Sequence, residues 1–265
     1  MTRIACPTLL LALSLVACKQ ADDDPGTPED LTYTVSGRVS AWHSADTLPD
    51  PTTLAVEIFD AWETNPDPFA ASAPVLARPI LGADGTFEEV VTEDAAAGPI
   101  AGLVVDDAPG QADRVVATIN DKRVDRMNEL AAIDGFAIDR VRAEGWLASP
   151  VLEGSDPIAL GASVITFLDG ARAPVAGVVP GVGGVPAGEG ATPPDVTVYF
   201  FDADGLALED ATTTETTASG MILVVGAPGF LVSGQVPGGA TTFDILGAGT
   251  RPGTIFVETV SEVTR

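Results

Sequence analysis

The cysteines are the side chains of this 265-residue sequence with the most distinctive chemistry, because a thiolate is a strong nucleophile and metal ligand. Cys18 directly follows an apolar run, Ile4–Ala17, and Arg3 places a positive charge ahead of that run. The run has the length of a signal-peptide apolar region and is too short to cross a hydrocarbon core of roughly 30 Å as a helix. We therefore expect residues 1–17 to be a cleaved export leader, which would also remove Cys6.

Leu15, Val16, Ala17 and Cys18 resemble the lipobox of bacterial lipoproteins. In that family the cysteine thiol receives a diacylglyceryl group, and cleavage makes the cysteine the first residue of the mature chain. The resemblance implies lipidation of Cys18 and a membrane anchor, since two acyl chains anchor stably where one does not. Lys19 stands where an Asp often marks retention at the inner membrane, which favours the outer membrane or cell surface. The alternatives are a plain secretory leader, or a buried apolar segment in which the cysteine has no special role.

Catalytic chemistry has little support elsewhere in the sequence. The single histidine, His43, lies beside Trp42, and no Gly-x-Ser-x-Gly motif presents a nucleophile to it. Zinc sites draw several ligands from His and Cys, which the mature chain would lack. We expect no catalytic residue, no metal and no cofactor, and interpret His43 as a satisfied surface or packing residue. A carboxylate-dependent carbohydrate hydrolase is a weaker alternative, because it needs only two of the 38 acidic side chains.

Calcium binding is a second alternative function. The segment Asp202–Gly205, with Glu209 and Asp210 just after it, superficially resembles the start of a calcium loop. It lacks the third oxygen ligand and the fixed-distance glutamate of an EF-hand. The simpler interpretation is a β-turn in which Asp202 accepts a backbone hydrogen bond and Gly205 takes a positive φ.

The excess of acidic residues limits which molecules can bind to the chain. With 38 acidic and 13 basic residues, the chain has a net charge of −25 and repels nucleic acid and anionic lipid head groups. The acidity serves solubility or a salty medium, or else the binding of basic partners or divalent cations. The partners expected are the membrane, through the lipid, and an envelope glycan or protein.

Residues 18–30 form a predicted flexible acidic tether. The segment contains Asp22, Asp23 and Asp24 and almost nothing apolar, so burial cannot repay the entropy of ordering it. A coil of this length reaches roughly 20 Å, which would hold the folded part clear of the bilayer.

Residues 31–120 are predicted to form a first β-sandwich. Leu31–Ala41 alternates apolar and polar residues, which is typical of a strand with one buried face. Further short apolar segments are separated by turns rich in Gly, Pro and Asp, and this pattern favours a sandwich or barrel. These segments are 54–59, 87–92, 100–105 and 115–119.

Residues 151–265 are predicted to form a second sandwich that repeats the first. Three pairs of segments carry the repeat: Val175–Val179 mirrors Val35–Val39, Val198–Ala203 mirrors Val56–Ala61, and Ala218–Ile222 mirrors Ala83–Phe87. Two copies are better interpreted as tandem domains than as a solenoid, which needs at least three stacked repeats.

These segments resemble carboxypeptidase-regulatory-like domains, which have a transthyretin-like sandwich fold. The resemblance rests on Val35-x-Gly37-x-Val39, the strand Val56–Phe59 and the turn Asp84-Gly85-Thr86-Phe87. The second copy departs from the pattern, with Ser219-Gly220-Met221 at the turn. Immunoglobulin-like sandwiches share much of this pattern.

Residues 121–150 are predicted to be a helical connector between the sandwiches. Apolar residues recur at helical spacing through 120–135 and 137–146, with Asn120 or Asp121 as a possible cap. The fold class expected is therefore mainly β, with two tandem antiparallel β-sandwiches joined by a short helical segment. The function expected is a non-enzymatic structural or ligand- and partner-binding role on a lipid-anchored cell-envelope protein.

Overall fold

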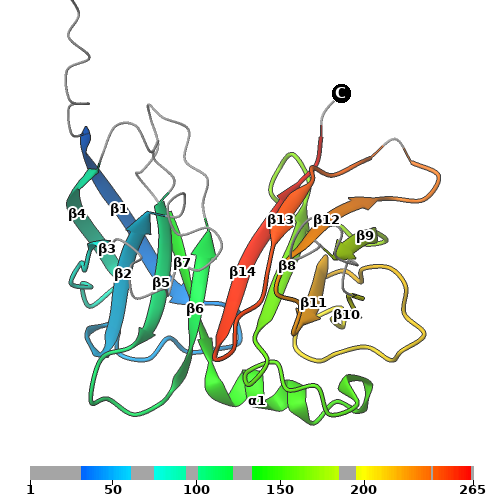
Figure 1. Cartoon of the computed structure of the whole chain (residues 1–265), viewed down its shortest axis with the longest axis horizontal. Helices are drawn as coiled ribbons and strands as arrows, with labels where there is room; N and C mark the ends of the chain where they lie inside the picture. The colour runs from blue at the N-terminus through cyan, green and yellow to red at the C-terminus, as the bar shows by residue number, and fades with distance from the viewer. Residues whose placement is uncertain are drawn as a thin grey trace, which may run out of the picture.

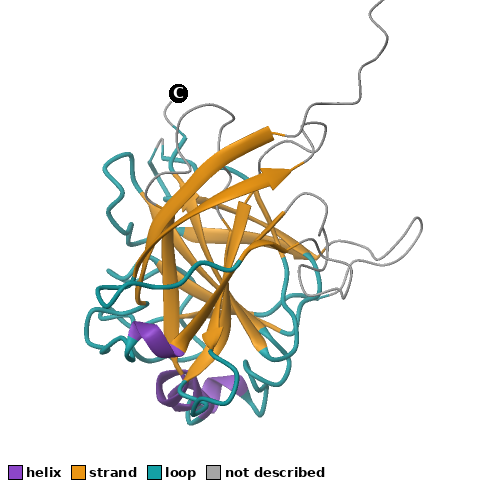
Figure 2. Cartoon of the chain, turned by 90° about the vertical axis from the view of Figure 1, so that its left-hand side faces the viewer, coloured by secondary structure: helices purple, strands orange, loops and turns teal. Residues whose placement is uncertain are grey.

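The computed structural model describes residues 31–60, 75–93, 101–121, 133–184, 195–239 and 241–263. They form a mainly-β structure of two sandwich-like units, which confirms the mainly-β class and the two sandwiches expected from the sequence (Figures 1 and 2). Besides the strands there are one α-helix, α1 (Arg140–Leu147), and two short 3-10 helices, Pro51–Thr53 and Pro150–Leu152. No helix among the described residues is long and apolar enough to cross a membrane.

The first unit is built around β1 (Leu31–Ala41), which pairs antiparallel with β4 (Thr86–Glu93) and parallel with β7 (Ile133–Asp139). The strands of its second layer are β2 (Leu54–Asp60), β3 (Val75–Ala77), β5 (Ala101–Asp107) and β6 (Val115–Asp121). Alternating side chains of the two layers form the core, which includes Val35, Val56, Phe87, Leu103 and Ile133. β6 also pairs with β7 and closes one corner of the unit.

The second unit repeats this plan around β8 (Ala162–Leu168), which pairs antiparallel with β11 (Met221–Val225) and parallel with β14 (Thr254–Ser261). β10 (Val198–Phe200) extends this sheet beyond β11. The opposite sheet consists of β9 (Val179–Gly184), β12 (Phe230–Gln235) and β13 (Leu246–Ala248). The core between the sheets includes Phe167, Ile222, Phe230 and Val232.

The two units contain an equivalent turn before β4 and before β11. The N–H of Val39 donates to the carbonyl of Gly85, and the N–H of Phe167 donates to the carbonyl of Gly220, both at 2.9 Å. Both glycines have a positive φ, 81° and 66°, at the turn that leads into β4 or β11. The correspondence predicted between residues 83–87 and 218–222 is therefore present in the fold.

The other two predicted correspondences are wrong. Val175–Val179 is a turn that enters β9, and the strand equivalent to β1 is β8. β8 is buried on both faces because Ala162 and Val164 pack in one apolar cluster and Ile165 and Phe167 pack in another, so its sequence lacks the alternation that marks β1. Val198–Ala203 does not match β2 either, because β10 pairs with β11 in the sheet of β8.

The two units share one sheet. β14 runs parallel to both β6 and β8 and lies between them, so that eight strands follow in the order β10-β11-β8-β14-β6-β5-β2-β3 (Figure 1). These parallel pairings distinguish the fold from two separate antiparallel sandwiches in tandem. β14 therefore joins the two halves through backbone hydrogen bonds.

The predicted helical connector is largely wrong. Its residues 133–139 form β7, Asn120 and Asp121 belong to β6, and only α1 is helical; residues 122–132 lie outside the described residues. The amide of Asn120 is buried and bonds the backbone of Phe136 instead of capping a helix, accepting at 3.0 Å and donating at 3.3 Å. Burial in β7 alternates from Ile133 to Ala137, which is the period of a strand with one buried face.

Candidate functional site at the junction of the two units

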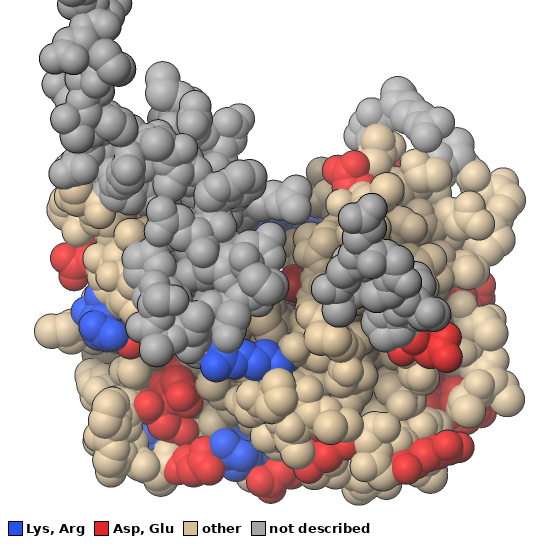
Figure 3. Space-filling model, in the orientation of Figure 1, with Lys and Arg blue, Asp and Glu red and all other residues tan. Residues whose placement is uncertain are grey.

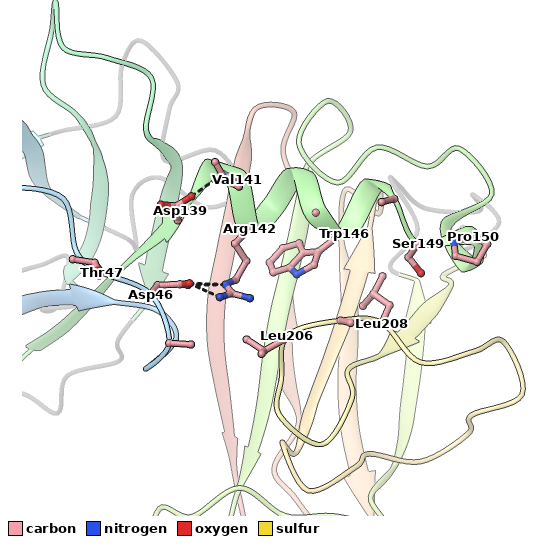
Figure 4. Close-up of a pocket in the computed structure, with 14 residues that line it drawn as sticks. Asp46, Thr47, Asp139, Val141, Arg142, Trp146, Ser149, Pro150, Leu206 and Leu208 are labelled. Atoms are coloured by element: carbon pink, nitrogen blue, oxygen red, sulfur yellow. Dashed lines mark hydrogen bonds and ion pairs between the residues drawn. The ribbon is translucent and has the colours of Figure 1, made fainter.

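A cleft of about 850 Å³ opens where the two units meet (Figure 4). Its walls are α1, the loop after β1 and a turn of the second unit. The side chains that shape it are Asp46, Thr47, Val141, Arg142, Trp146, Leu206 and Leu208. The strand β7 ends at Asp139, whose Oδ1 accepts the N–H of Val141 at 2.8 Å and starts α1 across the end of the sheet.

Asp46 and Arg142 form an ion pair in one wall of the cleft. Arg142 Nε donates to both carboxylate oxygens of Asp46, at 2.9 and 2.7 Å, and Nη2 donates to Oδ1 as well. The hydrogen bonds and charge of Asp46 raise the pKa of the Arg142 guanidinium. The side chains are only 17% and 10% exposed, so this pair is desolvated and fixes the loop after β1 against α1.

Trp146 forms the inner end of the cleft. Its ring is 1% exposed and makes edge-on contacts with Trp42 and Phe201, at centroid distances of 5.6 and 5.4 Å. The indole Nε1 has no hydrogen-bond partner among the described residues. Because buried polar groups in proteins are nearly always paired, a buried donor with no acceptor among the described residues is unusual.

His43 joins the two units beside this aromatic cluster. Its Nδ1 accepts the N–H of Ala45 at 3.0 Å, which leaves Nε2 to carry the proton that it donates to the carbonyl of Asp204 at 2.7 Å. Both ring nitrogens are engaged with backbone groups. The geometry matches the interpretation of His43 as a packing residue.

The segment 202–205 is the β-turn that the sequence suggests. Oδ1 of Asp202 accepts the N–H of Leu206 at 2.7 Å, and Gly205 has a φ of 73°. Asp210 forms a similar turn by accepting the N–H of Thr212 at 2.8 Å. Among the described residues there is no group of three or more His, Cys, Asp or Glu side chains placed to hold a metal.

The carboxylates of Asp106 and Asp107 lie at the end of β5. Asp107 Oδ2 accepts the N–H of Arg114 at 2.7 Å and that of Val115 at 2.9 Å. Desolvation raises the pKa of Asp106, with a smaller contribution from the charge of Asp107, although the Asp106 side chain keeps much of its surface in solvent. Neither carboxylate lines the cleft, so they are not the paired carboxylates of a hydrolase there.

Replacing Asp106 with Asn is expected to raise the melting temperature at pH 7 by about 1–2 °C, the size of a favourable surface substitution. Because the pKa of Asp106 is raised in the folded state, folding favours the protonated carboxyl over the charged one. The charged carboxylate therefore lowers the stability of the fold at pH 7. This cost is absent at a pH below the unfolded pKa, where the carboxyl is protonated in both states. The gain from the substitution should therefore vanish at pH 3. Melting curves at the two pH values check this, and an equal gain at both would show that the charge is not the cause.

The structure does not describe the site residues named from the sequence. Cys18 and the preceding Leu15, Val16 and Ala17 fall outside the described residues. The cleft residues Asp46 and Arg142 are 96 positions apart, and no sequence pattern connects them. Trp146 does stand at helical spacing, but that spacing indicates burial and says nothing of a cleft.

Comparisons with known proteins identify no family. No family model and no curated protein matches the chain. Among solved structures, the shaft pilin SpaA from Lactobacillus rhamnosus GG aligns with 89% of this chain and 99% of its own, at 9% identity and a TM-score of 0.26. The Bacillus anthracis TIE protein aligns over 88% of this chain and 34% of its own, at 8% identity and a TM-score of 0.26. A streptococcal ancillary pilin aligns over 88% and 63%, at 12% identity and a TM-score of 0.24. Scores this low carry no conclusion about function.

Proposed function

We propose that this chain is a lipid-anchored protein of a bacterial cell envelope with a non-enzymatic structural or partner-binding role. The observation that carries the proposal is the sequence Leu15-Val16-Ala17-Cys18 at the end of an apolar leader. Lipid on Cys18 would tie the folded body to a membrane, and Lys19 after it favours the outer membrane or cell surface. The acidic residues 18–30 would then act as a spacer.

The arrangement of the folded body suits display away from a membrane. The chain enters the fold at Leu31, at the top of Figure 1, and β1 runs from there towards the end that carries α1. An 11-residue strand spans roughly 35 Å, so the cleft lies at the far end of the body from Leu31. A body whose two halves share one sheet would hold that end in a fixed orientation.

We also propose that both units are carboxypeptidase-regulatory-like, transthyretin-like sandwiches. The equivalent turns at Gly85 and Gly220 and the equivalent pairing of β1 and β8 support a duplicated unit. Sandwich domains of this kind are scaffolds that present loops and clefts, so the fold by itself names no ligand.

Fractionation of cells that express the full chain tests the anchor. The wild-type protein should sediment with membranes and require detergent for release, while Cys18→Ala should lose this dependence. The matched control is Cys6→Ala, which removes the other cysteine and should leave the protein in the membrane fraction. Membrane association of Cys18→Ala equal to that of the wild type would refute lipid anchoring at this residue.

A further inference from the structure

The cleft continues into a second hollow of about 440 Å³ along the same end of the molecule. Thr47, Asp139 and Val141 line both hollows, so together they form one groove that crosses the end of the first unit and reaches the second. We propose that this groove binds an extended peptide segment of a partner protein, with an apolar side chain in the cleft and a basic residue beside it. The inference deepens the proposed partner-binding role and rests on it.

One hydrogen-bonding feature indicates an occupant with exposed carbonyl groups. The indole Nε1–H of Trp146 lacks an acceptor among the described residues, although the ring is 1% exposed. Figure 4 shows this nitrogen directed towards the turn that carries Leu206 and Leu208, on the opposite wall. A peptide carbonyl would satisfy the donor once one of these leucine side chains changes rotamer, and burial would make the bond strong.

The charges around the groove select a basic occupant. Arg142, Arg140 and Arg114 are each paired with an aspartate in the structure. Asp139 and Glu144, by contrast, line the groove without an ion pair among the described residues. Figure 3 shows several acidic side chains, with a basic one among them, along the lower edge of the molecule, where Figure 1 places α1. A lysine or arginine next to the apolar anchor would be attracted by this field.

The lining favours a peptide over a glycan. Sugar sites commonly present an aromatic face, whereas the ring of Trp146 is buried. The groove instead offers aliphatic contacts from Val141, which is 76% exposed, and from Leu206 and Leu208. An aliphatic side chain gains about 0.8 kcal/mol for each buried methylene in such a cleft.

The test is selection from a library of capped heptapeptides by the full chain, purified from cells. We expect enrichment of peptides with a central apolar residue flanked by Lys or Arg. Val141→Lys should weaken binding of the selected peptides at least tenfold, because it removes an apolar contact and adds a repelling charge. Val90→Lys is the matched control: Val90 is 59% exposed on the edge strand β4, away from the groove, and should leave binding unchanged.

A second variant isolates the indole donor. Trp146→Phe keeps an aromatic ring but removes the N–H, and should weaken the selected peptides about tenfold, the value of one buried hydrogen bond. In the wild type, adding the peptide should shift the Trp146 indole N–H resonance.

The proposal is overturned if no peptide is enriched over a blank support or if Val141→Lys binds the selected peptides as well as Val90→Lys. Binding of a neutral glycan that Val141→Lys abolishes, without peptide binding, would also overturn it. None of these outcomes bears on the lipid anchor, which fractionation tests separately.

Discussion

A chain that ends at Gly253 is expected to lose the folded second unit and to leave the first strongly destabilised. The deletion removes β14, whose residues pair with four residues of β6 and seven of β8. It also removes Ile255, Val257 and Val260, which are 0%, 8% and 2% exposed. Losing one such aliphatic side chain costs about 2–5 kcal/mol, so three approach the whole stability of a typical protein.

Circular dichroism and limited proteolysis measure this effect. The truncated chain should show no cooperative thermal transition from the second unit and should be cleaved rapidly. The control is deletion of residues 264–265 only, which leaves β14 complete and should melt as the intact chain does. If the chain ending at Gly253 retained the wild-type transition, β14 could not be the strand that joins the two units.

Replacing Asp46 with Ala is expected to destabilise the protein by about 2–4 kcal/mol, because it leaves the guanidinium of Arg142 largely buried without its partner. For a chain of this length the melting temperature should fall by about 5–12 °C. The double variant Asp46→Ala/Arg142→Leu should recover much of this loss, because it removes the unpaired charge as well. Denaturant unfolding of the single and double variants gives the coupling energy.

The exposed pair Arg78–Glu57 provides the control. Its side chains are 68% and 37% exposed, so Glu57→Ala should cost less than about 0.5 kcal/mol. An equal cost for Asp46→Ala and Glu57→Ala would contradict the desolvated environment assigned to the pair in the cleft wall.

The parts of the fold that were predictable are those with local sequence signals. The alternation of Leu31–Ala41 identified β1, and the turns containing Gly85 and Gly220 marked the start of equivalent strands. The sequence favours a helix over residues 137–146 because Ile138, Val141 and Trp146 recur at helical spacing, yet Ile138 belongs to β7 and only Val141 and Trp146 belong to α1. The spacing of apolar residues cannot distinguish a strand from a helix when the segment is short.

The remaining features depend on contacts between distant segments. Nothing in the composition of β14 indicates that it lies between β6 and β8, since parallel pairing is set by how the chain returns in space. In the same way, the ion pair of Asp46 and Arg142 exists only because the loop after β1 meets α1. The cleft therefore had no signature in the sequence.

We propose that the mature chain begins at a lipidated Cys18. Mass spectrometry of the N-terminal peptide from protein extracted with detergent tests it most directly. We expect a peptide that starts at Cys18 and carries the mass of a diacylglyceryl group, with or without an amide-linked acyl chain. A peptide with an unmodified Cys18 thiol, or one that extends into residues 1–17, would contradict it.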